Sequence, residues 1–326
     1  MVLGTGSIGM RHISVLRQME GVRVTAVPTR PERVAELLAR GITALPSLQD
    51  ALQDQPAGVV VATDSGRHAG DAEACLAICP VLVEKPMTPS LEQARRLVMV
   101  ASSSGNALHV GCCLRFDAGL AWARDRLEAV GRPHLLDVEC LSWLPAWRPQ
   151  RDLLSSYSAR PGEGGVLLDL IHEIDSCFWF AGPWQTVVAQ TENRGLVGLP
   201  EAVEETAIVL GRHSSGLSSS VRLSYAIGQA TRRLRLWGSN GALAWDGIKR
   251  EARRMDSGGA QVESFSWSGP EPMYRAQMDA WVGTLRGDAS DRLVDAAHGA
   301  YEVAVCETAR RSQTTGRRED VPWLAP

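Results

Sequence analysis

The feature that most constrains the fold is a glycine-rich segment near the start of the chain, Gly4-Thr5-Gly6-Ser7-Ile8-Gly9. It follows a short strand-like run and precedes an amphipathic one. Glycines at these spacings between a strand and a helix are typical of a turn that binds the pyrophosphate of a dinucleotide. Gly4 allows the tight turn, Gly6 lets the backbone approach the phosphates, and Gly9 lets the helix pack closely on the strand. The residues expected at the cofactor are Gly4, Gly6, Ser7, Ile8 and Gly9.

The rest of the first third alternates short β-branched runs with longer amphipathic runs, as the strands and crossover helices of a parallel sheet do. The runs expected as strands are Val22 to Val27, Gly58 to Ala62, Val81 to Val83 and Leu108 to Leu114. The runs expected as helices are Met10 to Met19, Arg33 to Leu38, His68 to Ile78 and Leu91 to Ala101. This pattern predicts a doubly wound α/β Rossmann domain over residues 1–117.

The pattern changes after residue 117. Helices are expected at Leu120 to Val130 and Val166 to Phe180, on either side of an irregular stretch, and again at Met273 to Leu285 and Ala296 to Gln313. Strands are expected at Thr206 to Leu210, Leu217 to Tyr225, Arg232 to Trp237 and Ala242 to Trp245. Consecutive strands with tight turns indicate an antiparallel sheet. Residues 118–326 are therefore expected to form an α+β domain, built on an open and mainly antiparallel sheet, that binds substrate and mediates oligomerisation.

Composition narrows the class of protein further. A chain of 326 residues with 44% hydrophobic and 22% charged residues suits two globular domains. A net charge of −3 gives no general attraction to nucleic acid or to an anionic membrane, and no apolar run reaches membrane-spanning length. Seven cysteines without zinc-site spacing indicate free thiols in a reducing compartment, so a cytoplasmic protein is expected. No metal site is expected, and catalysis by the adjacent Cys112 and Cys113 is disfavoured because no basic partner stands beside them.

The end of the second strand bears on cofactor choice. A protein that prefers NAD usually carries Asp or Glu there to bind the ribose 2′-hydroxyl, whereas this chain reads Val27-Pro28-Thr29-Arg30. Thr29 and Arg30 are suited to hydrogen-bonding and neutralising a 2′-phosphate. NADP is therefore favoured, NAD remains possible, and an Arg30 that is merely exposed is the structural alternative.

Several motifs in one order carry a family resemblance. They are Arg11-His12 after the glycine loop, Ala62-Thr63 with His68, Glu84-Lys85-Pro86, and Gly164-Gly165 leading to Asp169, His172 and Asp175. In this order the chain resembles the Gfo/Idh/MocA oxidoreductases over nearly its whole length. The resemblance implies a Rossmann domain, a following α+β domain whose open sheet often forms the oligomer interface, and substrate bound between the two. It also implies a homodimer or homotetramer, and places Thr63, His68, Glu84 and Lys85 at the cofactor, with a helix-capping role as the alternative for His68.

Hydride transfer from an alcohol needs a group that takes the hydroxyl proton and a neighbour that steadies the developing charge. Lys85 lies at the carboxyl edge of the expected sheet and is assigned to the reacting oxygen. His172 is the candidate proton acceptor, and Asp169 orients it or holds a substrate hydroxyl. The roles of Lys85 and His172 are interchangeable at this stage. Most relatives separate the aspartate and histidine by four residues rather than three, but either spacing keeps both on one helical face.

Aromatic and basic side chains concentrate just upstream of this helix, including Trp143. Aromatic rings pack against sugar rings and arginines pair with carboxylates or phosphates, so the stretch predicts a specificity wall for an acidic sugar, sugar acid or nucleotide-sugar. A loop that only packs the domains together is the alternative. The residues expected to bind substrate are Lys85, Arg115, Trp147, Arg148, Tyr157, Arg160, Asp169 and His172. Two other functions stay open: reduction of a non-sugar carbonyl or imine, and a catalytically silent nicotinamide sensor.

Overall fold

The computed structural model describes residues 1–147, 149–150 and 152–322, which divide into two compact units. The first unit consists of Met1–Cys113 and Met273–Ala300, and the second of Leu114–Pro272 and residues 301–322. The sequence placed residues 118–326 in one domain. The structure instead assigns most of helix α9 (Glu271–Leu285) and strand β15 (Val294–Asp295) to the first unit.

The first unit is built on a seven-stranded sheet in the order β15-β6-β5-β4-β1-β2-β3. All neighbouring strands are parallel apart from β15, which runs antiparallel to β6. The strands are β1 (Val2–Leu3), β2 (Thr25–Val27), β3 (Thr43–Ala44), β4 (Val59–Val61), β5 (Val81–Val83) and β6 (Leu108–Val110). This is the predicted doubly wound order, in which ligands bind at the carboxyl ends of the strands where the order reverses, between β1 and β4.

Two helices of this unit begin at a serine whose hydroxyl caps the first turn. The hydroxyl of Ser90 accepts a hydrogen bond from the backbone N–H of Gln93 at the start of α5, which ends at Gly105 with a left-handed φ of 70°. The helices are α1 (Ser7–Leu16), α2 (Arg33–Ala39), α3 (Leu48–Gln53), α4 (His68–Leu76) and α5 (Leu91–Ser104). The sequence did not predict α3 or β3, because elements of six and two residues are too short to show a hydrophobic period.

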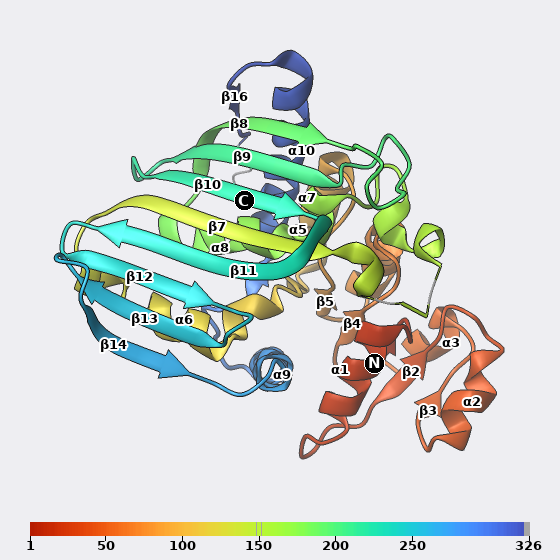
Figure 1. Cartoon of the computed structure of the whole chain (residues 1–326). Coiled ribbons are helices and arrows are strands. Elements are labelled where there is room, and N and C mark those ends of the chain that lie inside the picture. Colours follow the sequence, from red (N-terminus) through yellow and green to blue (C-terminus); the bar gives the residue numbers. More distant parts are fainter. Residues whose placement is uncertain (148, 151, 323–326) are drawn as a thin grey trace. The chain divides into compact units, whose positions relative to one another are not determined.

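The second unit is built on a nine-stranded sheet in the order β14-β13-β12-β11-β7-β10-β9-β8-β16. Neighbouring strands are antiparallel except for β7 and β10, which are parallel, so the predicted, mainly antiparallel character is confirmed. Figure 1 shows the long β7 and β11 crossing its centre. The strands are β7 (Pro133–Trp143), β8 (Trp184–Glu192), β9 (Thr206–His213), β10 (Ser218–Ser224), β11 (Ala226–Gly238), β12 (Gly241–Asp246), β13 (Glu251–Asp256), β14 (Gln261–Ser266) and β16 (Glu319–Asp320).

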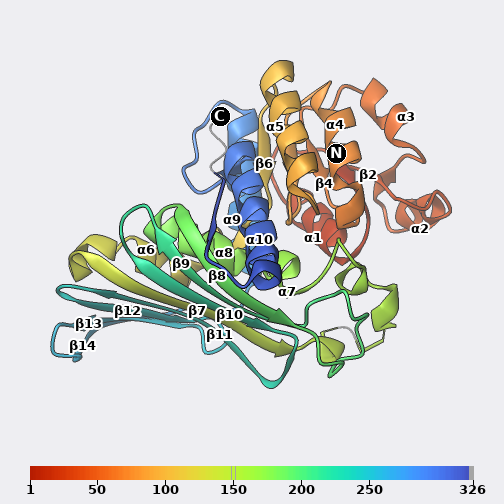
Figure 2. The ribbon, with the colours of Figure 1, turned by 90° about the horizontal axis from the view of Figure 1, so that it is seen from above.

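Helices cover one face of this sheet and leave the other open (Figure 2). They are α6 (Ala118–Arg124), α7 (Val166–Asp169), α8 (Ile171–Ala181) and most of α10 (Ala296–Thr315). The alternation along β9 reflects this layering: Ala207 and Val209 are buried, whereas Ile208 and Leu210 are 44% and 54% exposed. No helix in the described residues is long and apolar enough to cross a membrane.

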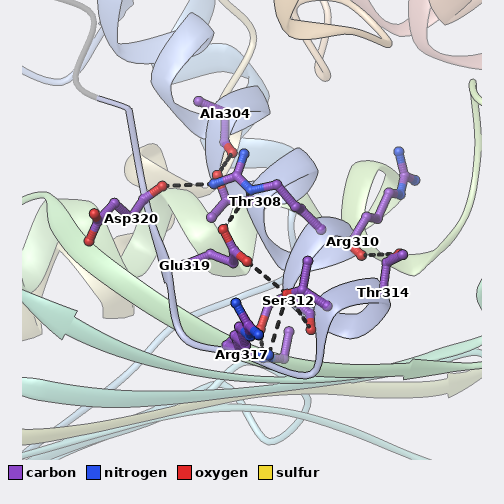
Figure 3. A network of polar contacts seen from close by, with 11 residues as sticks. Ala304, Thr308, Arg310, Ser312, Thr314, Arg317, Glu319 and Asp320 are labelled. Atoms are coloured by element: carbon purple, nitrogen blue, oxygen red, sulfur yellow. Dashed lines mark hydrogen bonds and ion pairs between the residues drawn. The ribbon is translucent and has the colours of Figure 1, made fainter.

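The chain returns to this sheet after α10 through a compact set of polar contacts (Figure 3). The hydroxyl of Ser312 donates a hydrogen bond to the carbonyl of Arg317 at 2.6 Å. The carboxylate of Glu319 accepts from Arg311 at 2.8 Å and from the Thr315 hydroxyl at 2.7 Å. These contacts hold the turn after α10 so that β16 pairs with β8 at the edge of the sheet.

Candidate active site

The glycine turn has the geometry that the sequence predicted for each of its three glycines. Gly4 adopts a left-handed φ of 94°, and a Cβ there would lie 2.4 Å from the carbonyl oxygen of Ala62. A Cβ on Gly9 would lie 2.0 Å from the carbonyl oxygen of Gly4, so the helix packs directly on the turn. At Gly6, in contrast, no heavy atom of the described residues lies within 4 Å of the added Cβ, apart from the two chain neighbours. Gly6 also caps α1 without a side-chain hydrogen bond, which leaves the N–H groups of Ser7 and Ile8 in an uncapped first turn. This open turn fits a pyrophosphate.

The segment after β2 brings one arginine to this turn. Thr29 and Arg30 are exposed, as expected of residues that meet a ligand or solvent. Arg33, which the sequence analysis missed, donates from Nη1 to the carbonyl oxygen of Thr5 at 2.6 Å and to its hydroxyl at 3.0 Å. Its position three residues after Arg30, at the start of α2, was the available signal.

His68 joins two loops of the first unit. Its Nδ1 lies 2.8 Å from the carbonyl oxygen of Pro86 and its Nε2 lies 3.1 Å from that of Thr63. The ring is almost fully buried, and burial lowers its pKa. The hydroxyl of Thr63 donates to Asp71 at 2.8 Å. These contacts favour a structural role for His68, which ties the loop after β4 to the loop after β5.

Lys85 follows β5 by two residues, at the carboxyl edge of the parallel sheet, where the sequence predicted it. Its neighbour Glu84 is buried, and the carboxylate of Glu84 lies 2.7 Å from Nε2 of His12 in α1. Glu84 was expected at the cofactor, but its carboxylate is engaged by a side chain of the protein.

In the second unit, the predicted helix from Val166 to Phe180 is two helices. The chain leaves helical geometry at Leu170, with φ −99° and ψ 32°, so α7 ends at Asp169 and α8 begins at Ile171. The expectation that Asp169 and His172 share one face of a continuous helix is therefore wrong. The three-residue spacing is accommodated by a break between them, and both side chains are buried.

The carboxylate of Asp169 accepts hydrogen bonds from three hydroxyl groups. Tyr157 donates at 2.6 Å, Ser158 at 2.8 Å and Tyr225 at 2.9 Å. Burial, followed by the charge of Asp169, raises the pKa of Tyr225 well above its usual value, so this hydroxyl remains a donor. Tyr225, directly after β10, was not among the sequence candidates, because a tyrosine in a strand-like run resembles an ordinary packing residue. These contacts make Asp169 the anchor of the loop that contains Tyr157.

The other residues of the predicted specificity wall differ in their contacts and exposure. The indole of Trp147, 42% exposed, meets the ring of Tyr225 edge-on at 5.7 Å between centroids. The guanidinium of Arg160 donates to Glu163 at 3.2 Å and is partly exposed. Trp143 is 38% exposed. Arg148 lies outside the described residues.

Arg115 does not sit in this loop. It was expected to bind substrate, but its guanidinium lies 2.6 Å from the carboxylate of Asp175, with both side chains buried. Buried charges are retained where they are paired in this way. This pair joins η2 (Cys113–Phe116) to α8.

Both units match known protein families. Residues 1–112 match an oxidoreductase family with an NAD-binding Rossmann fold, GFO_IDH_MocA, and residues 123–244 match the GFO/IDH/MocA C-terminal domain. The chain is 27% identical over 316 residues to inositol 2-dehydrogenase 2 of Paenarthrobacter aurescens (strain TC1), covering 91% of this chain and 90% of the relative. It is 30% identical over 229 residues to the rhizopine catabolism protein MocA of Rhizobium meliloti, covering 67% and 69%.

The fold is also shared with a solved structure, levoglucosan dehydrogenase in complex with NADH. The TM-score is 0.89 at 17% identity, over 99% of this chain and 98% of the other. The predicted family is thus confirmed by sequence in both units, and the fold is shared over almost the whole chain. The chain belongs to the Gfo/Idh/MocA family of NAD-binding oxidoreductases.

Proposed function

We propose that this protein is an NAD(P)-dependent dehydrogenase that acts on a CH–OH group of a sugar, sugar acid or nucleotide-sugar. The observation that carries the proposal is the open glycine turn at Gly6, in the same unit as a lysine at the carboxyl edge of the sheet. The curated relatives, named as inositol dehydrogenases, support a polyol substrate.

Bound at the glycine turn, a nicotinamide dinucleotide would accept or supply the hydride. The ammonium of Lys85 would donate a hydrogen bond to the reacting oxygen, and the imidazole of His172 would take the hydroxyl proton. The two roles can be exchanged between these residues. Asp169, with three hydroxyl donors on its carboxylate, would act by holding the neighbouring loop.

A panel of polyols, sugar acids and nucleotide-sugars, assayed with NAD and NADP by absorbance at the reduced-nicotinamide band, tests the proposal. We expect turnover on at least one carbohydrate. Turnover only on non-sugar carbonyls or imines would identify a different class of reductase. Tight cofactor binding without hydride transfer to any compound would identify a sensor.

We further propose that NADP(H) binds more tightly than NAD(H). Thr29 and Arg30 are exposed at the end of β2, and Arg33 adds a guanidinium beside the glycine turn. Loss of a charge-assisted phosphate contact costs about 1.5 to 3 kcal/mol, so Arg30→Ala should weaken NADP binding by roughly ten- to a hundred-fold. Fluorescence titration with both cofactors measures the effect, and equal losses for NAD and NADP would contradict the preference.

We propose an anionic sugar as the substrate class. Trp147 and Arg160 lie in the stretch before Asp169 and are partly exposed, although Arg160 shares its charge with Glu163. Arg160→Ala and Arg148→Ala should raise the KM for a charged sugar far more than for its neutral analogue. Equal effects on both sugars, together with lower thermal stability, would indicate a packing loop.

We propose that two copies associate through the open face of the nine-stranded sheet, as a homodimer or within a homotetramer. Exposed Val188 pairs in register with exposed Leu210, and Ile208 lies two residues away on the same face. Beside them, Arg222 pairs with Glu139 at 2.9 Å.

Seven buried cysteines without a disulfide suit a reducing compartment, and we place the protein in the cytoplasm.

A further inference from the structure

The hydroxyl of Tyr225 contacts both ends of the short helix that precedes His172. It donates to Oδ2 of Asp169, the last residue of α7, at 2.9 Å, and it lies 3.2 Å from the carbonyl oxygen of Gly165, the N-cap of this helix. Helix α7 has only four residues, and the chain leaves helical geometry at Leu170 before α8 begins. A hydroxyl that contacts both ends of α7 therefore fixes the turn that leads into His172.

The ring of the same tyrosine contacts the stretch that was predicted to bind substrate. The indole of Trp147 meets the ring of Tyr225 at 90°, with 5.7 Å between the centroids, and its Nε1 donates to the hydroxyl of Ser142 at 3.1 Å. The carbonyl of Tyr225 accepts a hydrogen bond at 2.9 Å from the N–H of Leu144, the first residue of η4 (Leu144–Ala146). The partly exposed indole is thus oriented by Tyr225 and Ser142.

Tyr225 is held rigidly and has no exposed surface. Its side chain is fully buried, and its backbone N–H donates to the carbonyl of Glu205 at 2.8 Å. The pKa of its hydroxyl is raised by burial and by the charge of Asp169, so the hydroxyl stays a donor. A residue buried in this way acts on a substrate only through its neighbours, which here are Asp169 and Trp147.

We infer that Tyr225 is a positioning residue for the dehydrogenase reaction. Its hydroxyl holds the Asp169 turn, and with it the start of α8 at His172. Its ring holds the indole of Trp147, against which a sugar ring would pack. The inference rests on the proposed function, in which His172 takes the proton and Trp147 binds substrate. The two contacts predict separate effects on kcat and KM.

Tyr225→Phe tests the hydroxyl, because it keeps the ring and its contact with Trp147. Misplacement of a reacting group by about 1 Å costs up to about a hundred-fold in rate, so we expect kcat to fall about ten- to a hundred-fold. KM should change by less than about two-fold. Tyr301→Phe is the matched control, since it removes an equally buried hydroxyl that donates to the carbonyl of Trp184 at 2.6 Å. This control should retain the wild-type kcat and KM.

Trp147→Leu tests the ring. Loss of the aromatic face should raise KM for the sugar by about two- to ten-fold. In a Tyr225→Leu background, the same substitution should raise KM by less, because the indole has already lost the ring that orients it. Equal increases in both backgrounds would overturn the role of the ring.

Tyrosine NMR reads the hydroxyl contact without turnover. Only four residues of the chain are tyrosines, at positions 157, 225, 274 and 301, so protein labelled with ¹³Cζ-tyrosine gives four signals that single Tyr→Phe variants assign. The hydroxyls of Tyr157 and Tyr225 donate to the same carboxylate. We expect Tyr225→Phe to move the signal of Tyr157 and to leave those of Tyr274 and Tyr301 in place.

A wild-type kcat in Tyr225→Phe, or an equal loss of kcat in Tyr301→Phe, would overturn the inference. If Tyr225→Phe does not fold, Ser158→Ala takes its place: it removes a second donor to Oδ2 of Asp169 and should lower kcat with KM retained, and a normal kcat would overturn the inference. If the wild type oxidises no carbohydrate of the panel, the proposed function fails. An unmoved Tyr157 signal would overturn the hold of Tyr225 on Asp169 independently of turnover.

Discussion

At the scale of single residues, the first prediction concerns Lys85 and His172. Groups that act in proton transfer or on a developing charge mainly affect turnover, and positioned acid–base groups contribute about a hundred-fold or more. We expect Lys85→Met and His172→Ala each to lower kcat by at least about a hundred-fold, with cofactor affinity unchanged. Steady-state kinetics and fluorescence titration of the cofactor measure the two quantities. Near-normal turnover of His172→Ala across pH would move the proton-transfer role to another residue, with Lys85 the next candidate.

A second prediction concerns His213, at the end of β9, whose buried ring lies 2.6 Å from the carbonyl oxygen of Gly182 and 2.8 Å from the hydroxyl of Ser219. Burial lowers its pKa to about 4, whereas the unfolded chain titrates near 6.5. The unfolded state therefore binds more protons between these values, and stability should fall as pH drops from about 6.5 toward 4. From this residue alone the loss at pH 5 is about 2 kcal/mol.

Urea unfolding at pH 7 and pH 5 measures this dependence. His213→Asn keeps a donor toward Gly182 without titrating in this range, so the variant should lose less stability between the two pH values than the wild type. Equal pH dependence in both proteins would assign the acid sensitivity to other groups.

The residues of the site could be predicted from the sequence where their role depends on local spacing along the chain. The three glycines of the turn and Lys85 depend on local geometry, and the structure places each as the sequence indicated. Arg115 could not be resolved in the same way, because its partner Asp175 is 60 residues away and the pair forms only when the unit folds. Tyr225 was missed for the same reason: it meets Asp169 across 56 residues of sequence.

At the scale of elements, the break between α7 and α8 leads to a prediction for Asp169. If its carboxylate anchors the loop that contains Tyr157 and Ser158, Asp169→Asn weakens three hydrogen bonds to a charged acceptor, at a combined cost of about 2 to 4 kcal/mol. The loop should then become more susceptible to limited proteolysis. Tyr157→Phe, which removes one of the three bonds, should cost about 1 kcal/mol. Wild-type stability with abolished turnover would instead show that Asp169 acts in the chemistry.

Elements were predictable when their hydrophobic pattern was long and regular. Helices α5 and α9 and strands β9 and β10 lie close to the ranges expected from periodicity. Strand β7 was missed, although it is central, because its burial does not alternate: Val138, Glu139 and Cys140 are all buried in sequence. The buried charge of Glu139 is tolerated in β7 because Arg222 and Arg233, on the neighbouring strands, form ion pairs with its carboxylate.

At the scale of the whole molecule, the assignment of Met273–Ala300 to the first unit could not be predicted from the sequence. A run of helical residues carries no signal for which sheet it packs against. In the structure, a Cβ on Gly58 would lie 3.0 Å from Trp281 and 2.8 Å from Leu285, so α9 packs beside the start of β4, although Gly58 and Trp281 are 223 residues apart in the chain. Long-range packing of this kind decides to which unit a helix belongs.

The last prediction concerns association through the open face of the nine-stranded sheet. Val188, Ile208 and Leu210 are 39%, 44% and 54% exposed on adjacent strands. A two-fold interface uses the same patch on both copies, so a single substitution introduces a charge on each side of the interface. Each charge then lies against the like charge of the partner copy or against its apolar surface. We expect Leu210→Arg to convert the assembly to monomers at micromolar concentration, measured by sedimentation velocity, with little change in unfolding free energy. Leu38→Arg, at a residue 53% exposed on α2 in the other unit, is the matched control and should leave the oligomeric state unchanged. A wild-type protein that sediments as a monomer would show that no such interface forms. A Leu210→Arg variant that still associates would place the interface elsewhere.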